Sequence, residues 1–305
     1  MAVRKKLAEV FQAKKTDPSL WFNLLLFTTL GFIFWPFTKW LAQNAQDQSR
    51  LLNALIILIL AIFCLVRFNR VKVKNPLNLN KNARNGLFLA YFSLFVGFLL
   101  NYFSRQASSL EILLDLSTII AFCATTYAFV LFLFGKDFRK ISLTACITFS
   151  LFISVSTFMG AIDWPLRTLA GKWSGYILSL LGKSVELGIP EDTALAPQLI
   201  LVVDGIKFHV ASECNGFGVI LSCLLISFLL SIYNQLRLLP LLTNLAAGLF
   251  LGFAFNILRI TCIVLAAPFV IGHYDLMHEI IGIITFWSAL IITWLLFNGP
   301  TRDVQ

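Results

Sequence analysis

Long apolar runs are the feature that most constrains how this chain folds. About eight runs reach the roughly 17–25 residues that a helix needs to cross the hydrocarbon core of a bilayer. Because lipid offers no hydrogen-bond partner to a free backbone group, we expect all of these runs to be α-helices. They cover residues 20–37, 51–68, 86–104, 111–134, 141–162, 215–233, 241–267 and 279–297.

The composition agrees with lipid as the main solvent of the chain. Hydrophobic residues make up 58% of its 305 residues and charged residues only 13%, whereas soluble domains have about 45–50% and about 25%. A water-soluble core could not hide so many apolar side chains. We therefore predict an all-α integral membrane protein that forms one polytopic domain over residues 1–305. The net charge of +9 then bears on topology, and nucleic acid is not expected as a partner.

Positive charge is distributed unevenly between the runs. Most of the 24 Lys and Arg residues lie before the first run, after the last one and in every second connection, above all in segment 67–85. Because Lys and Arg concentrate on the cytoplasmic side of a membrane, both termini are predicted to be cytoplasmic. The first run follows Lys14 and Lys15, and no A-x-A-like cleavage site comes after it. We interpret it as an uncleaved span and not as a signal peptide.

Segment 163–213 connects the fifth and sixth runs and is then outside. It opens on Asp163-Trp164-Pro165, a pattern typical of a helix start, and apolar side chains follow at helical spacing through residues 164–184. Three cations interrupt this stretch: Arg167, Lys172 and Lys183. We interpret it as a helix lying on the membrane surface. The alternative is a ninth span, which would move everything downstream to the other side.

The end of the same segment predicts a short β-hairpin. Two runs rich in β-formers, 199–203 and 206–210, are joined by Asp204-Gly205. Asp-Gly between two such runs is a strong hairpin signal. We therefore place the hairpin between the surface helix and the sixth run.

Arg259 is a charged residue inside the seventh run. A charge inside a span is costly unless it meets water or a partner. Asn256 lies three residues earlier and therefore on the same helical face. Two interpretations stay open: the side chain snorkels from near the outer end, or it is an anion-binding group that faces a cavity. The pairing with Asn256 favours a polar interior face.

Cys214 stands at the predicted N-terminus of the sixth run. The free N–H groups and the positive dipole end of a helix N-terminus stabilise a thiolate. Gly216 and Gly218 follow and would let a substrate backbone come close. The plainer alternative is a Cys that merely starts a helix. The other Cys residues lie in apolar runs: Cys64, Cys123, Cys146, Cys223 and Cys262.

No Cys pair has CxxC spacing, so neither a zinc site nor a disulfide framework is indicated, and we expect no cofactor or metal. Cys262, one turn beyond Arg259, is a less exposed rival nucleophile. His278 begins the eighth run on the outside, where Asp275 and Glu279 could orient its ring. His209 and His273 also fall in outside segments.

A thiol, an imidazole and a guanidinium would thus share one membrane face. Together they supply a nucleophile, a general acid/base and a cation for a developing oxyanion. The second class of function left open is a transporter or assembly factor of an exopolysaccharide or export system. Arg259 and Asn256 would then line a pathway, but the inverted repeats expected of transporters are not detected. A zinc protease would need a second His where Gly282 stands.

Three short motifs in this order resemble the exosortase/archaeosortase family: Cys214-Asn215-Gly216, Asn256-Ile-Leu-Arg259-Ile260 and His278-x-x-x-Gly282-x-x-x-Phe286. The resemblance covers roughly residues 163–297. Residues 1–162 contribute five generic spans, residues 163–213 the outside helix and hairpin, and residues 214–297 the three spans with the motifs.

The resemblance implies a membrane-embedded cysteine peptidase or transpeptidase of the prokaryotic plasma membrane, with its active site on the extracytoplasmic face. Its substrates would be exported proteins with a C-terminal motif, a transmembrane helix and a basic tail (PEP-CTERM-like). Carried over by position, Cys214 is the nucleophile, His278 the general acid/base and Arg259 the carbonyl or transition-state stabiliser. The supporting residues are Asn256, Gly216, Asn215, Glu279 and Asp275.

An acyl-enzyme on the Cys would be released by water or by an amine or hydroxyl acceptor. The commonest motif of the family has Ser or a similar small residue after the Cys, where this chain has Asn215. That departure leaves the subfamily open, and with it the recognition motif and the acceptor.

Overall fold

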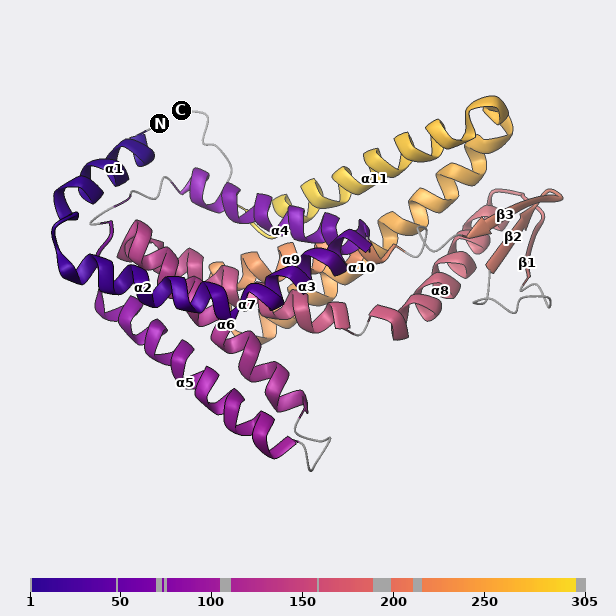
Figure 1. Cartoon of the computed structure of the whole chain (residues 1–305). Coiled ribbons are helices and arrows are strands. Elements are labelled where there is room, and N and C mark those ends of the chain that lie inside the picture. The colour runs from indigo at the N-terminus through magenta and orange to yellow at the C-terminus, as the bar shows by residue number, and fades with distance from the viewer. Residues whose placement is uncertain are drawn as a thin grey trace. The chain divides into compact units, whose positions relative to one another are not determined.

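The computed structural model describes residues 2–47, 49–69, 73, 76–104, 111–157, 159–188, 199–210 and 216–299, and these residues are mostly helical (Figure 1). The α-helices are α1 (Ala2–Lys14), α2 (Pro18–Ile33), α3 (Trp35–Asp47), α4 (Ser49–Phe68), α5 (Lys81–Ser104), α6 (Glu111–Phe134), α7 (Arg139–Thr157), α8 (Met159–Leu180), α9 (Phe217–Tyr233), α10 (Leu238–Ala266) and α11 (Tyr274–Leu296). Short 3-10 helices cover Lys136–Phe138, Ala267–Phe269 and Ile271–His273.

Five helical segments among the described residues are long and apolar enough to cross a membrane: Lys81–Tyr102, Leu113–Phe134, Lys136–Ser156, Leu238–Phe269 and Tyr274–Leu296. Three shorter apolar helices lie at Pro18–Ile33, Leu52–Phe68 and Phe217–Tyr233, and they overlap the first, second and sixth predicted runs. The predicted runs are therefore helical, and the number of eight spans stays a prediction.

The first predicted run, residues 20–37, holds two helices where one was expected. Helix α2 ends at Ile33 and α3 begins at Trp35. Pro36 explains the break, because its ring would clash with the carbonyl four residues earlier in a continuous helix, whereas a proline in the first turn of a new helix is tolerated.

The boundary between the fifth run and the surface helix also differs from the expectation. Helix α7 ends at Thr157 and α8 begins at Met159, so Pro165 lies inside α8 and does not mark its start. A proline removes one hydrogen bond of the helix interior.

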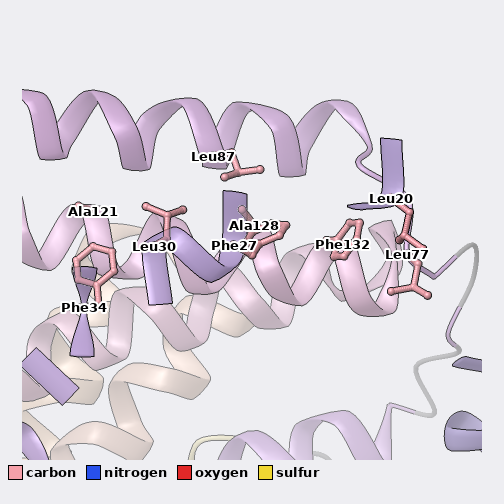
Figure 2. Packing of buried hydrophobic residues seen from close by; sticks show 9 residues of the cluster. All are labelled: Leu20, Phe27, Leu30, Phe34, Leu77, Leu87, Ala121, Ala128 and Phe132. Atoms are coloured by element: carbon pink, nitrogen blue, oxygen red, sulfur yellow. The ribbon is translucent and has the colours of Figure 1, made fainter. Parts of the chain in front are cut away.

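The contacts between residues divide the chain into two compact units. The first unit contains α1 to α3, the last part of α4, α5, α6 and most of α7. In it α5 and α6 lie side by side (Figure 1). Figure 2 shows the apolar core of this unit, formed by Leu20, Phe27, Leu30, Phe34, Leu77, Leu87, Ala121, Ala128 and Phe132.

The second unit contains residues 49–59 of α4 and residues 152–299. Its helices α9 and α10 cross at two glycines one turn apart, Gly248 and Gly252. A Cβ atom on Gly252 would lie 2.6 Å from the Cα atom of Ile220. Bare glycines let two helix backbones approach this closely, as is common between helices in lipid. The crossing fixes the position of α9 against α10.

A three-stranded antiparallel sheet belongs to the second unit. Strands β2 (Leu199–Val203) and β3 (Ile206–Val210) confirm the predicted hairpin. Its turn residues, Asp204 and Gly205, have φ values of 49° and 81°, as a type I′ turn requires. Strand β1 (Val185–Gly188), which pairs with β2, was not predicted.

The turn of the hairpin is tied back to the end of α8. Lys183 Nζ donates a hydrogen bond of 2.8 Å to the Asp204 carboxylate, and the Ser184 N–H donates another of 3.0 Å. The hydrogen bond from Lys183, followed by that from Ser184, lowers the pKa of Asp204. The carboxylate therefore stays ionised at neutral pH and holds the turn.

Helix α8 packs on the sheet and on α10. Gly171 and Gly175 leave space for the side chains of Leu199 and Leu201 on β2, and Ser174 Oγ lies 3.5 Å from the Ile257 carbonyl of α10. An apolar cluster holds these elements together: Ala170, Leu178, Leu199, Leu201, Val203, Ile260 and Val264. The sheet is thereby fixed to the C-terminal end of α10, which we call the sheet end.

Candidate functional site

A polar pocket of about 210 Å³ lies inside the second unit. Helices α4, α9, α10 and α11 supply its walls. It is lined by Asn53, Gly216, Gly218, Val219, Phe255, Asn256, Arg259, Gly282, Thr285 and Phe286. Arg259 brings a positive charge to this lining, and the lining residues that the structure describes include no Asp or Glu.

The Arg259 side chain rests on helix α11 at Gly282. Its Nη2, Nε and Cζ atoms lie 3.2, 3.3 and 3.4 Å from the position that a Cβ atom on Gly282 would take. Because Gly282 has no side chain, the guanidinium can occupy this space. The structure places Arg259 and Asn256 in the same pocket, in agreement with the polar interior face predicted from their spacing.

Gly216 joins the start of α9 to α10. It is the N-cap of α9, its φ is 73°, and a Cβ atom on it would overlap the side chain of Asn256, which is fully buried. Glycine is needed here both for the left-handed backbone and for the close approach. The start of α9 is thereby held against Asn256, one turn from Arg259.

Gly216→Ala is expected to lower the free energy of unfolding by roughly 2–5 kcal/mol, because the left-handed backbone and the overlap with Asn256 are both penalised. The thermal unfolding midpoint in detergent measures the effect. Gly205→Ala has the backbone penalty without a neighbour within 4 Å, and Gly188→Ala has neither. A loss for Gly216→Ala no larger than that for Gly205→Ala would contradict the close packing against Asn256.

The position of the pocket along α10 follows from the helical rise. Asn256 lies ten residues before Ala266, so the start of α9 lies about 15 Å from the sheet end. A helix N-terminus carries a positive dipole end and N–H groups that helix bonds do not use. Together with Arg259, it makes the pocket favourable for an anion or a carbonyl oxygen.

His278 lies on the same stripe of α11 as two lining residues. Gly282 and Phe286 follow it at intervals of four residues, so all three share one face of the helix. The His278 ring is half-buried, is not part of the pocket lining, and lies 6.1 Å from the ring of Tyr274 between centroids. Helix α11 begins at Tyr274. The sequence predicted His278 at the start of this helix, but His278 lies in its second turn.

The remaining predicted residues either do not line the pocket or lie outside the described residues. Asp275 and Glu279 are exposed, and Cys262 is half-buried and does not line the pocket. Cys214 and Asn215 lie outside the described residues, and so does the side chain of His209.

Sequence reasoning missed two polar residues that line the pocket. Asn53 and Thr285 come from the second and eighth runs. An Asn within an apolar run is the kind of signal that could have indicated the first of them. Among the described residues, no group of three or more His, Cys, Asp or Glu could hold a metal ion.

Apolar helices of spanning length together with a cation-bearing pocket between helices define a multi-pass membrane protein with a polar site. The chain belongs to the transmembrane exosortase family (Exosortase_EpsH), whose model matches residues 22–295. The match includes most of the first five runs, which carry none of the three motifs. No curated protein and no solved structure matches the chain.

Proposed function

We propose that the chain is a cysteine peptidase or transpeptidase that cleaves C-terminal sorting signals from exported proteins. The observation that carries this proposal is the position of Arg259, seated on Gly282 in a pocket that the start of α9 also lines. Cys214 precedes Gly216 by two residues, so covalent geometry keeps their Cα atoms within about 7 Å of each other. A nucleophile at this position can serve a carbonyl bound in the pocket.

The proposed reaction follows from the groups at the site. The Cys214 thiolate attacks the scissile carbonyl carbon, and a C–S bond forms while the carbonyl oxygen becomes an oxyanion. Arg259 stabilises that charge. The C–N bond then breaks as His278 donates a proton to the leaving amine, which leaves a thioester on Cys214. Water, an amine or a hydroxyl acceptor attacks the thioester, gives its proton to His278 and restores the thiolate.

The proposed substrates are proteins that end in a short motif, a transmembrane helix and a basic tail. The helix would lie in lipid beside the enzyme, with the basic tail on the cytoplasmic side, where Lys and Arg are favoured. The motif would then reach the pocket from the extracytoplasmic face. This arrangement requires both termini of the chain to be cytoplasmic and the sheet to be outside, in the plasma membrane of a prokaryote.

The test is a comparison of C-terminal peptides from host cells with and without the chain. Proteins with the expected tail should lose it only in cells that contain the chain. Added hydroxylamine should appear as a C-terminal hydroxamate on the shortened proteins, because it attacks a thioester intermediate as an amine acceptor. Unchanged C-termini in both cell types would overturn the proposal, and a defect confined to polysaccharide export would favour the assembly factor.

A further inference from the structure

Asn53 brings a carboxamide into the pocket from a helix that carries none of the three motifs. It lies on α4, and residues 49–59 of α4 belong to the same compact unit as α9, α10 and α11. The Asn53 side chain is exposed and lines the open part of the pocket, one turn of α4 before the buried Ile57.

Asn53 and Asn256 both bring a carboxamide to the described lining of the pocket, but Asn256 is fully buried and Asn53 is exposed. Arg259 has only hydrogen-bond donors. The Thr285 hydroxyl donates to the Ile281 carbonyl at 2.7 Å, so only its lone pairs are available to a ligand. Asn53 has both an NH₂ donor and a carbonyl acceptor on one flat group. This is the complement of a peptide bond, which has one N–H and one C=O.

We propose that Asn53 binds the main chain of the substrate in the pocket. Its Oδ1 atom accepts the N–H of a substrate peptide group next to the scissile bond, while Arg259 donates to the scissile carbonyl. The two side chains hold an extended segment from opposite helices, α4 and α10. The inference rests on the proposed function for its substrate class. The placement of Asn53 beside Arg259 is independent of that function and has its own test.

The first experiment needs no substrate. Asn53→Cys introduces a thiol at position 53 of a chain that also carries Cys214→Ala. This thiol is labelled in separate reactions with two thiosulfonate reagents, the anionic sulfonatoethyl and the cationic trimethylammonioethyl compound. Leu52→Cys, at the preceding position, where the native side chain is 40% exposed, serves as the matched control for the intrinsic rates of the two reagents. Relative to that control, the anionic reagent should be favoured about tenfold at position 53, because the pocket is positive.

Arg259→Gln should remove that preference at position 53 and leave position 52 unchanged. Equal preferences at the two positions, or a preference that survives Arg259→Gln, would overturn the placement of Asn53 beside Arg259. This outcome is independent of whether the chain cleaves any protein.

The second experiment measures processing. The probe is a reporter that ends in the tail of a protein shortened only in cells with the chain. Asn53→Leu keeps the side-chain volume but makes no hydrogen bond, and it should raise KM about tenfold with little change in kcat. Asn53→Gln, which keeps the carboxamide, should recover part of the loss. An unchanged KM for Asn53→Leu would overturn the role of Asn53, whereas failure of the wild-type chain to process any reporter would overturn the proposed function alone.

Discussion

Cys214→Ala is expected to abolish processing while the protein is still inserted and folded. Without the sulfur no thioester forms, and removal of the nucleophile from a cysteine or serine peptidase lowers kcat by roughly four orders of magnitude or more. The measurement is the rate at which a tailed reporter is shortened in membranes, together with the amount of monodisperse protein recovered in detergent. A wild-type rate for this variant would refute the nucleophile assignment.

Cys262→Ala is the matched control for that substitution. Cys262 lies one turn beyond Arg259 on α10, is half-buried and does not line the pocket. We expect Cys262→Ala to process the reporter at close to the wild-type rate. Loss of activity in Cys262→Ala together with normal activity in Cys214→Ala would transfer the nucleophile role to Cys262.

Arg259→Lys is expected to lower kcat by roughly 10²-fold although the positive charge is kept. The guanidinium occupies the space above Gly282 with three of its atoms, and its planar fork directs several N–H groups at once. A lysine ammonium is a compact point charge and cannot reproduce that geometry. Loss of one oxyanion donor in other enzymes costs roughly 10²–10³-fold. Single-turnover processing of the reporter gives the rate.

Arg237→Lys controls for the exchange itself, because Arg237 is the exposed N-cap residue at the other end of the same helix. We expect Arg237→Lys to process the reporter at the wild-type rate.

Gly282→Ala tests the contact between the guanidinium and helix α11, because the added Cβ atom would force Arg259 to move by a few tenths of an ångström. Wild-type turnover in Arg259→Lys would show that charge suffices, and the geometric role of Arg259 would then be wrong.

The sequence predicted the helical runs and the hairpin well, because each rests on a local physical rule. Apolar runs of spanning length must satisfy their own backbone groups, and Asp204-Gly205 suits a turn with two positive φ values. The break before Pro36 was missed because an apolar run shows no change in hydropathy there. Strand β1 was missed because its four residues are mostly exposed and lack the alternation of a strand.

The pocket could be predicted only in part, for a related reason. Arg259 and Asn256 were found because polar groups in a span are costly and their spacing is helical. Asn53 was not found because its neighbours in space, on α9 to α11, lie more than 150 residues away in the sequence. Only the three-dimensional structure, in which Asn53 lines the same pocket as residues of those helices, reveals this. The position of the predicted nucleophile depends on residues 211–215, which are not described.

The start of α9 against Asn256, about 15 Å from the sheet end of α10, would limit which polypeptides the proposed peptidase accepts. An extended chain advances about 3.3 Å per residue, so a substrate that enters from the sheet end needs about five unstructured residues before its scissile bond. A compact exported domain that continued up to its membrane helix would be too bulky to enter. This distance would therefore restrict the proposed cleavage to loose tails and spare folded proteins anchored in the same membrane.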